Sequence, residues 1–292
     1  MSLPSLLRLF LLSAIWGASF PFMRVGVTAL SPAQLIFWRV GLASLFLSVG
    51  ALLLRRGLQL RGNLRHYFVL GFFNCVLPFM LYAYAARVAP AALLAVLNAT
   101  APMWATAIAA VLTQQGIRGK TALGLLLGIA GVSLLAGIET THIPAGGGLA
   151  VLAGLGSAFC YGIATHYSRH ARDIEPYANA HGCLWAATLT LAPLFFWDPI
   201  PAQAPAETVW LAVIGLGILC SGVAYLLYFR LVADIGPASA LTVTFLVPVF
   251  GILWGYLFLD EAIGWHTAAG CMLVLMGTAW VTGFTWAPLR KT

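Results

Sequence analysis

Long apolar runs, separated by short polar or proline-containing stretches, recur along the whole chain. Each run has about 18 or more residues with few charges, the length that a helix needs to cross the hydrocarbon of a bilayer. Because water is absent there, only a helix satisfies the backbone N–H and C=O groups of such a run. The pattern therefore predicts an all-α integral membrane protein. We expect ten transmembrane helices, over Leu6 to Ala29, Pro32 to Leu54, Leu64 to Ala86, Pro90 to Thr113, Thr121 to Ile138, Gly148 to Ser168, Pro176 to Trp197, Val209 to Val232, Pro237 to Leu259 and Trp265 to Phe284.

Proline stands at the expected start of four helices, at Pro32, Pro90, Pro176 and Pro237. Its fixed φ suits the first helical turn, where its missing N–H is not needed. The first segment could also be a secretory signal peptide, because only Arg8 precedes its apolar stretch. Nine similar segments follow it, so we interpret it as a retained helix.

Composition excludes an ordinary soluble domain. Hydrophobic residues make up 61% of the 292 positions and charged residues 8%, whereas soluble domains carry about 25% charged residues. The net charge of +7 could suggest a nucleic-acid partner, but the cations lie in short loops between apolar runs, and we expect a lipid bilayer and no nucleic acid. The cysteines form no CxxC or Cys/His ligand pattern, so we expect packing roles, no metal and no cofactor. They are Cys75, Cys160, Cys183, Cys220 and Cys271.

The loop charges predict an orientation. With the N-terminus in the cytoplasm, only Arg24 and Arg87 fall in outer loops, and Arg39 lies within the second helix. Cations in short loops favour the cytoplasmic side, so we expect both termini there, in a multi-pass protein of the bacterial inner (plasma) membrane. The cations assigned to the inner side are Arg8, Arg55, Arg56, Arg61, Arg65, Arg118, Lys120, Arg169, Arg172, Arg230, Arg290 and Lys291.

The two halves of the sequence resemble each other at an offset of about 146 residues, which predicts two repeats, at 1–143 and 144–292. Each repeat holds an odd number of helices, five, so the copies must cross the membrane in opposite directions. The charges agree, because Lys120 follows the fourth helix of the first copy and the acids Asp260 and Glu261 follow its counterpart. The matching residues are Tyr82 with Tyr228, Pro102 with Pro248, Gly124 with Gly270, Gly131 with Gly277, and Trp16-Gly17 with Tyr161-Gly162.

These motifs together resemble one transporter family. They are Trp16-Gly17, Arg39 early in the second helix, the run Tyr82 to Ala92, and the segment Gly236 to Pro248 followed by Asp260-Glu261. In order and duplication they are similar to the EamA type of the drug/metabolite transporter superfamily, and to its exporters of aromatic and neutral amino acids. The resemblance spans nearly the whole chain and implies ten helices, two inverted units and export of small metabolites. The first copy departs from it with Gln114-Gln115 where the second has Asp260-Glu261.

A substrate site is expected near the bilayer midplane, where inverted repeats meet beside interrupted helices. Pro21, Pro78, Pro102 and Pro248 interrupt four helices, although such prolines can also kink helices for packing alone. An aromatic-lined cavity would suit a neutral or zwitterionic metabolite. The candidate substrate-binding residues are Trp16, Asn74, Tyr82, Asn98, Trp104, Tyr161, His166, Tyr225, Tyr228, Thr244 and Trp254.

Each candidate has a structural alternative. Asn98 could make an interhelical hydrogen bond with no ligand, and His166 could lie near the inner surface. Arg39 could attract a carboxylate, but it could also bridge backbone carbonyls, and we favour this structural role. Glycines in the fifth and tenth helices are expected to allow close helix contact. They are Gly124, Gly128, Gly131, Gly270 and Gly277.

The expected function is export of amino acids, aromatic ones among them, by alternating access, and we expect a monomer. No Asp or Glu lies in the middle of a predicted helix, which favours facilitated movement over proton coupling, with His166 or Asp260-Glu261 as weaker coupling candidates. A multidrug or other metabolite carrier is the alternative. A membrane-embedded enzyme is less favoured because no nucleophile with a base or metal cluster is found, and a channel because no filter motif is visible.

Overall fold

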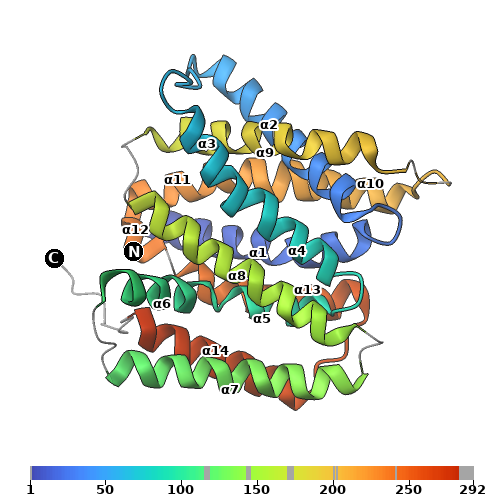
Figure 1. Cartoon of the computed structure of the whole chain (residues 1–292), viewed down its shortest axis with the longest axis vertical. Helices are drawn as coiled ribbons and strands as arrows, with labels where there is room; N and C mark the ends of the chain where they lie inside the picture. The colour runs from blue at the N-terminus through green and yellow to red at the C-terminus, as the bar shows by residue number, and fades with distance from the viewer. Residues whose placement is uncertain are drawn as a thin grey trace.

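The computed structural model describes residues 2–114, 119–142, 146–169, 174–199, 201, 203–240 and 242–282. Within these ranges every regular element is helical (Figure 1). The elements are α1 Leu3–Gly26, α2 Pro32–Leu53, α3 Leu64–Gly71, η1 Phe72–Val76, α4 Leu77–Ala85, α5 Ala91–Asn98, α6 Ala101–Thr113, α7 Gly119–His142, α8 Gly147–Arg169, α9 Pro176–Trp197, α10 Glu207–Ile214, η2 Gly215–Val223, α11 Ala224–Ile235, α12 Pro237–Ala240, α13 Val243–Leu259 and α14 Trp265–Thr282.

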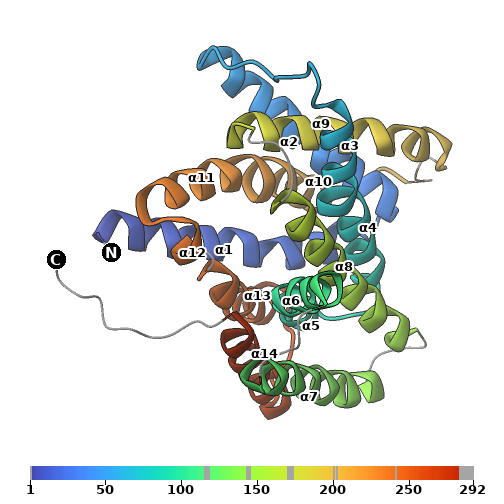
Figure 2. The same cartoon turned by 60° about the vertical axis from the view of Figure 1, so that its left-hand side comes forward.

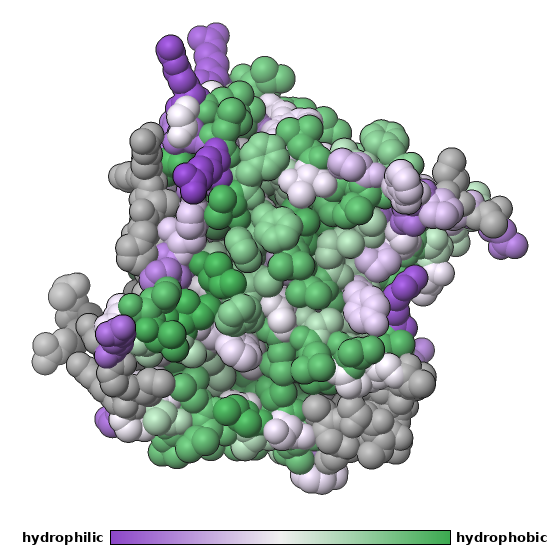
Figure 3. All heavy atoms as spheres, viewed as in Figure 1, coloured by the Kyte–Doolittle hydropathy of each residue, from purple (hydrophilic) through white to green (hydrophobic). Residues whose placement is uncertain are grey.

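Seven helical stretches are long and apolar enough to cross a membrane, and Gly119–Leu135 and Val243–Leu259 are shorter apolar helices. Apolar side chains also cover much of the surface in Figure 3; Phe196, for example, is 80% exposed. Such a surface is stable in lipid and not in water, so the chain is a multi-pass membrane protein. That all ten expected segments cross the bilayer stays a prediction. The seven long stretches are Leu3–Gly26, Pro32–Leu53, Leu64–Ala85, Ala91–Thr113, Gly147–Ser168, Pro176–Trp197 and Glu207–Ile235.

The start of α2 shows why a helix begins where proline predicts it. Pro32 occupies the first turn, and Ser31 and Gln34 form a reciprocal capping box in which each side chain bonds the other residue's backbone N–H. The Ser31 hydroxyl also donates to Asp198, which follows α9. The cap therefore joins the ends of α2 and α9.

Four predicted helices are not continuous α-helices. The expected helix Pro90 to Thr113 is divided into α5 and α6, and Pro237 to Leu259 into α12 and α13. Pro102 explains the first break, because its ring clashes with the carbonyl of Asn98, the last residue of α5. In the third and eighth expected helices, wider π-helical turns, η1 and η2, interrupt the α-helix. These two segments lie at equivalent positions of the sequence repeat.

α7 and α14 are in close contact, which confirms the prediction that their glycines allow close helix packing. A Cβ atom on Gly131 would lie 2.8 Å from the Gly270 carbonyl oxygen, and one on Gly124 would lie 2.7 Å from the Gly277 carbonyl oxygen. The two helices run side by side in Figures 1 and 2. Since Gly124 matches Gly270 and Gly131 matches Gly277 in the repeat, the contact is reciprocal, as in a two-fold interface.

A second pair of contacts has the same reciprocal form. Gly17 of α1 packs against Phe250 and Gly251 of α13, and Gly162 of α8 packs against Trp104 and Ala105 of α6. Residues 104 and 105 correspond to 250 and 251 at the repeat offset, as Gly17 corresponds to Gly162. The first helix of each sequence repeat thus packs on the fourth helix of the other repeat.

Glu261 joins the start of α5 to the C-terminal end of α1. Its carboxylate accepts hydrogen bonds from the N–H groups of Ala91 (2.7 Å) and Ala92 (3.1 Å) at the start of α5. It also lies 3.4 Å from Arg24 Nε. A carboxylate at a helix N-terminus satisfies free N–H groups and complements the helix dipole. These contacts give Glu261 a structural role, while proton coupling through it stays untested.

Candidate functional site

Arg39, in the first half of α2, is buried, with 4% of its surface exposed. Its Nε donates to Ser221 Oγ at 3.1 Å, and its guanidinium carbon lies 3.7 Å from the centre of the Phe79 ring. Among the described residues no carboxylate forms an ion pair with it. A guanidinium has five N–H donors, so most of this group's donors have no oxygen partner among the described residues.

One of the two π-helical segments contacts this arginine, because Ser221 belongs to η2. The other, η1, directly precedes α4, which carries Phe79. Asn74 of η1 donates to the Tyr225 hydroxyl at 3.4 Å, so these two candidates contact each other. Irregular turns of this kind often occur at functional sites, since they expose backbone groups and redirect side chains.

Two aromatic pairs join candidates from distant parts of the chain. The rings of Trp16 and Tyr228 are 5.6 Å apart, and those of Tyr82 and Tyr161 are 6.5 Å apart. Trp16 corresponds to Tyr161 in the sequence repeat, and Tyr82 to Tyr228, so the pairs are related in the same way as the helices.

Asn98 ends α5 at the break before Pro102. Its Oδ1 accepts a hydrogen bond of 3.3 Å from the Tyr82 hydroxyl. The interhelical bond that was the alternative to ligand binding therefore exists, and it holds Tyr82 in its pair with Tyr161. Thr244 occupies the corresponding position of the second repeat, near the start of α13.

Three candidates contact neighbouring helices elsewhere. Trp254 donates from its indole N–H to the Ala14 carbonyl at 2.9 Å, which joins α13 to α1. Trp104 packs edge-on against Phe159, with ring centres 5.4 Å apart. His166 is half-buried on α8, about one and a half turns beyond Tyr161. Trp254 and Trp104 thus contact Ala14 and Phe159, whereas Arg39 contacts Ser221 and Phe79.

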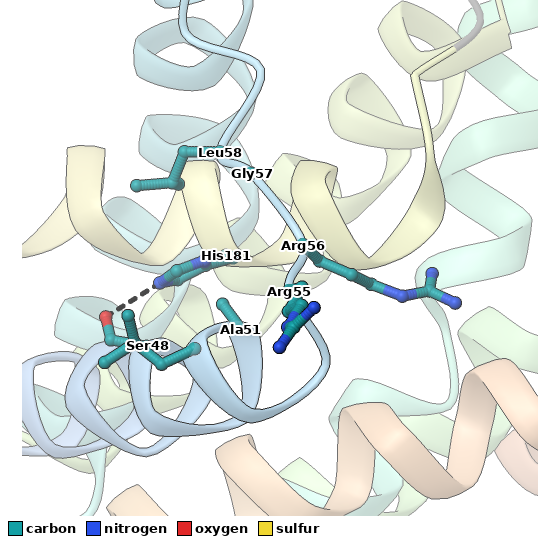
Figure 4. A pocket seen from close by; sticks show the side chains of 8 residues that line it. Ser48, Ala51, Arg55, Arg56, Gly57, Leu58 and His181 are labelled. Carbon is teal, nitrogen blue, oxygen red and sulfur yellow. Dashed lines mark hydrogen bonds between the residues drawn. The ribbon is translucent and has the colours of Figure 1, made fainter.

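Two cavities lie near the ends of the helices. One has a volume of about 580 Å³ and borders the end of α2 and α9 (Figure 4). The other has a volume of about 240 Å³ and is lined by Arg24, Val27, Thr28, Ala86 and Arg87. None of the candidate substrate residues lines either of them, so the central aromatic-lined cavity stays a prediction. No group of three or more metal-ligating side chains occurs among the residues described.

A family model of the EamA-like transporter family matches the sequence twice, at residues 3–137 and 148–283. The chain belongs to this family. The family and the relatives named below point to a transporter rather than an enzyme, and a transporter implies a small-molecule substrate. The family resemblance predicted from the sequence is thereby confirmed, whereas the closer resemblance to aromatic amino acid exporters is not.

Curated relatives of this EamA-like transporter agree over nearly the full length. The uncharacterized transporter YoaV of Bacillus subtilis (strain 168) is 23% identical over 90% of this chain and 91% of its own. YyaM of the same organism, also an uncharacterized transporter, is 26% identical over 96% of this chain and 94% of its own. A solved crystal structure superposes on 96% of each chain with a TM-score of 0.66 at 21% identity, which supports the fold alone.

Some partners of Arg39 could not be found from the sequence. Phe79 and Met23, whose Sδ lies 3.8 Å from an Arg39 amino group, are ordinary apolar residues in apolar runs and carry no signal. His181 does carry a signal in the sequence, because a histidine within the apolar span Pro176–Trp197 needs a hydrogen-bonding partner. It is buried and bonded to Ser48 on α2.

Proposed function

We propose that this transporter exports amino acids, aromatic ones among them, by facilitated alternating access. The observation that carries the proposal is the buried Arg39, which has no acidic partner among the described residues and lies against the ring of Phe79. A buried charge is costly unless it is compensated. A substrate carboxylate would supply that compensation.

The surrounding groups suit the rest of an amino acid. The half-buried rings of Trp16, Tyr161 and Tyr228 offer flat apolar surfaces for a side chain. Asn98 Oδ1 and the tyrosine hydroxyls can accept hydrogen bonds from an ammonium group. A site with one cation and several neutral acceptors therefore favours a zwitterion over a lipophilic cation, which Arg39 would repel.

The proposed architecture is ten transmembrane helices in two inverted five-helix units, with both termini in the cytoplasm of a bacterial cell and the protein acting as a monomer in the plasma membrane. The two family matches and the reciprocal glycine contacts support the repeat. In this account the units exchange roles, which opens the site first to one side and then to the other. The interrupted helices at Asn98 and η1 supply backbone that can bend.

Counterflow tests this proposal. Proteoliposomes are preloaded with unlabelled phenylalanine, tryptophan or threonine, and uptake of the same labelled compound is followed at two pH values, with protein-free liposomes as the control. A carrier accumulates label transiently, a channel only equilibrates it, and an enzyme alters the compound. We expect transient accumulation of the aromatic amino acids with little dependence on pH. Exchange of lipophilic cations, with all three amino acids ignored, would replace the proposal with drug efflux.

A further inference from the structure

The cavity at the end of α2 lies away from the proposed substrate site. Its volume is about 580 Å³, and it opens where the span Pro32–Leu53 ends and the chain turns back towards α3 (Figure 4). The end of a membrane span lies at the level of the lipid headgroups. The lining residues are Ser48, Ala51, Leu52, Arg55, Arg56, Gly57, Leu58 and His181.

One wall of this cavity is a fixed polar cluster between α2 and α9. Ser48 Oγ lies 2.9 Å from His181 Nε2 and accepts a hydrogen bond of 3.1 Å from the Trp185 indole N–H. His181 is 98% buried, so its ring is held by packing as well as by Ser48. Ala51, one turn after Ser48 on α2, and Leu58 add apolar lining. The cavity therefore presents polar and apolar surfaces side by side.

The cavity also has a cation without an acidic partner. Arg56 pairs with Glu175 and extends away from Ser48 and His181 in Figure 4. Arg55 is exposed and makes no ion pair within the described part of the chain. Its φ of 53° is in the left-handed region and turns the chain back over the end of α2. The cavity is thus complementary to an anion.

Exposed leucines next to Arg55 distinguish a lipid from a soluble anion. Leu52 and Leu53 are each 79% exposed in the last turn of α2, so an acyl chain can lie along them while its phosphate meets Arg55. A free phosphate ion would leave these leucines unused. We propose that this cavity binds the headgroup of an anionic phospholipid from the surrounding bilayer.

Native mass spectrometry of the full-length protein tests the site. Phosphatidylglycerol and phosphatidylcholine are titrated separately, and inorganic phosphate provides a third arm. We expect phosphatidylglycerol to bind more tightly than phosphatidylcholine, and Arg55→Gln to weaken that binding about fivefold, the factor that corresponds to about 1 kcal/mol for one basic residue at the membrane surface. Arg61→Gln is the matched control, because Arg61 is exposed in the same loop and does not line the cavity.

Three outcomes overturn the proposal. Equal affinity for both lipids removes the anion preference. Equal weakening by Arg55→Gln and Arg61→Gln means that charge acts without a site. Competition by inorganic phosphate at millimolar concentration means that the cavity takes a free anion. Both substituted residues are exposed, so each variant is expected to fold, and retained thermal stability of each variant verifies this.

Discussion

Arg39→Met is expected to lower amino acid counterflow by about 30-fold or more, while the thermal stability of the purified protein stays unchanged or rises. The loss of transport follows because removing one member of a buried, hydrogen-bonded charge pair costs about 2 to 5 kcal/mol of binding. The gain in stability follows because, without substrate, the guanidinium is a buried charge whose only oxygen partner in the described structure is Ser221, and replacing buried charges by apolar residues is often neutral or stabilising.

This pair of measurements separates the two roles considered for Arg39. A structural arginine would leave the protein less stable when replaced, and transport would fall only with the amount of folded protein. Arg65→Met is the matched control, because Arg65 is exposed and makes no ion pair among the described residues; it should retain both transport and stability. Loss of stability in Arg39→Met, with normal transport per folded molecule, would contradict the account.

Gly131→Ala is expected to destabilise the protein by about 1 to 3 kcal/mol, the usual cost of overpacking. The added Cβ would lie 2.8 Å from the backbone oxygen of Gly270 and 2.9 Å from Leu273 Cβ, so α7 and α14 must separate. The free energy of unfolding in detergent measures the effect. Gly119→Ala on the same helix is the control, since nothing lies within 4 Å of its added Cβ, and its better helix propensity should leave the protein equally or more stable. Equal effects of both substitutions would contradict the close packing.

The helices could be predicted because hydrocarbon imposes a minimum length on apolar runs. The span Pro176 to Trp197 is the same in prediction and structure, whereas α1 begins at Leu3, earlier than the expected Leu6, since Ser2 caps it. The π-helical segments η1 and η2 were not foreseen, because one extra residue in a turn leaves the apolar pattern of a lipid-facing run unchanged. The division after Asn98, by contrast, follows from Pro102, which is visible in the sequence.

The residues of the candidate site could be predicted from the sequence, but their partners could not. Arg39, Tyr82 and Asn98 stand out in the sequence because a polar group in a membrane helix needs a partner. The identity of that partner depends on the tertiary structure, because Ser221 lies 182 positions away from Arg39 in the sequence. The pairing of Trp16 with Tyr228 likewise follows from how the repeats pack, which the sequence repeat alone does not specify.

The central claim is that two five-helix units cross the membrane in opposite directions, and cysteine labelling from outside intact cells tests it most directly. Arg61→Cys and Asp260→Cys place single exposed thiols in the loops after the second and ninth expected helices. The unsubstituted chain is the control, since all five of its cysteines are buried. The account predicts that a membrane-impermeant maleimide labels position 260 and leaves position 61 unlabelled until the cells are opened. Labelling of both positions from the same side would contradict it.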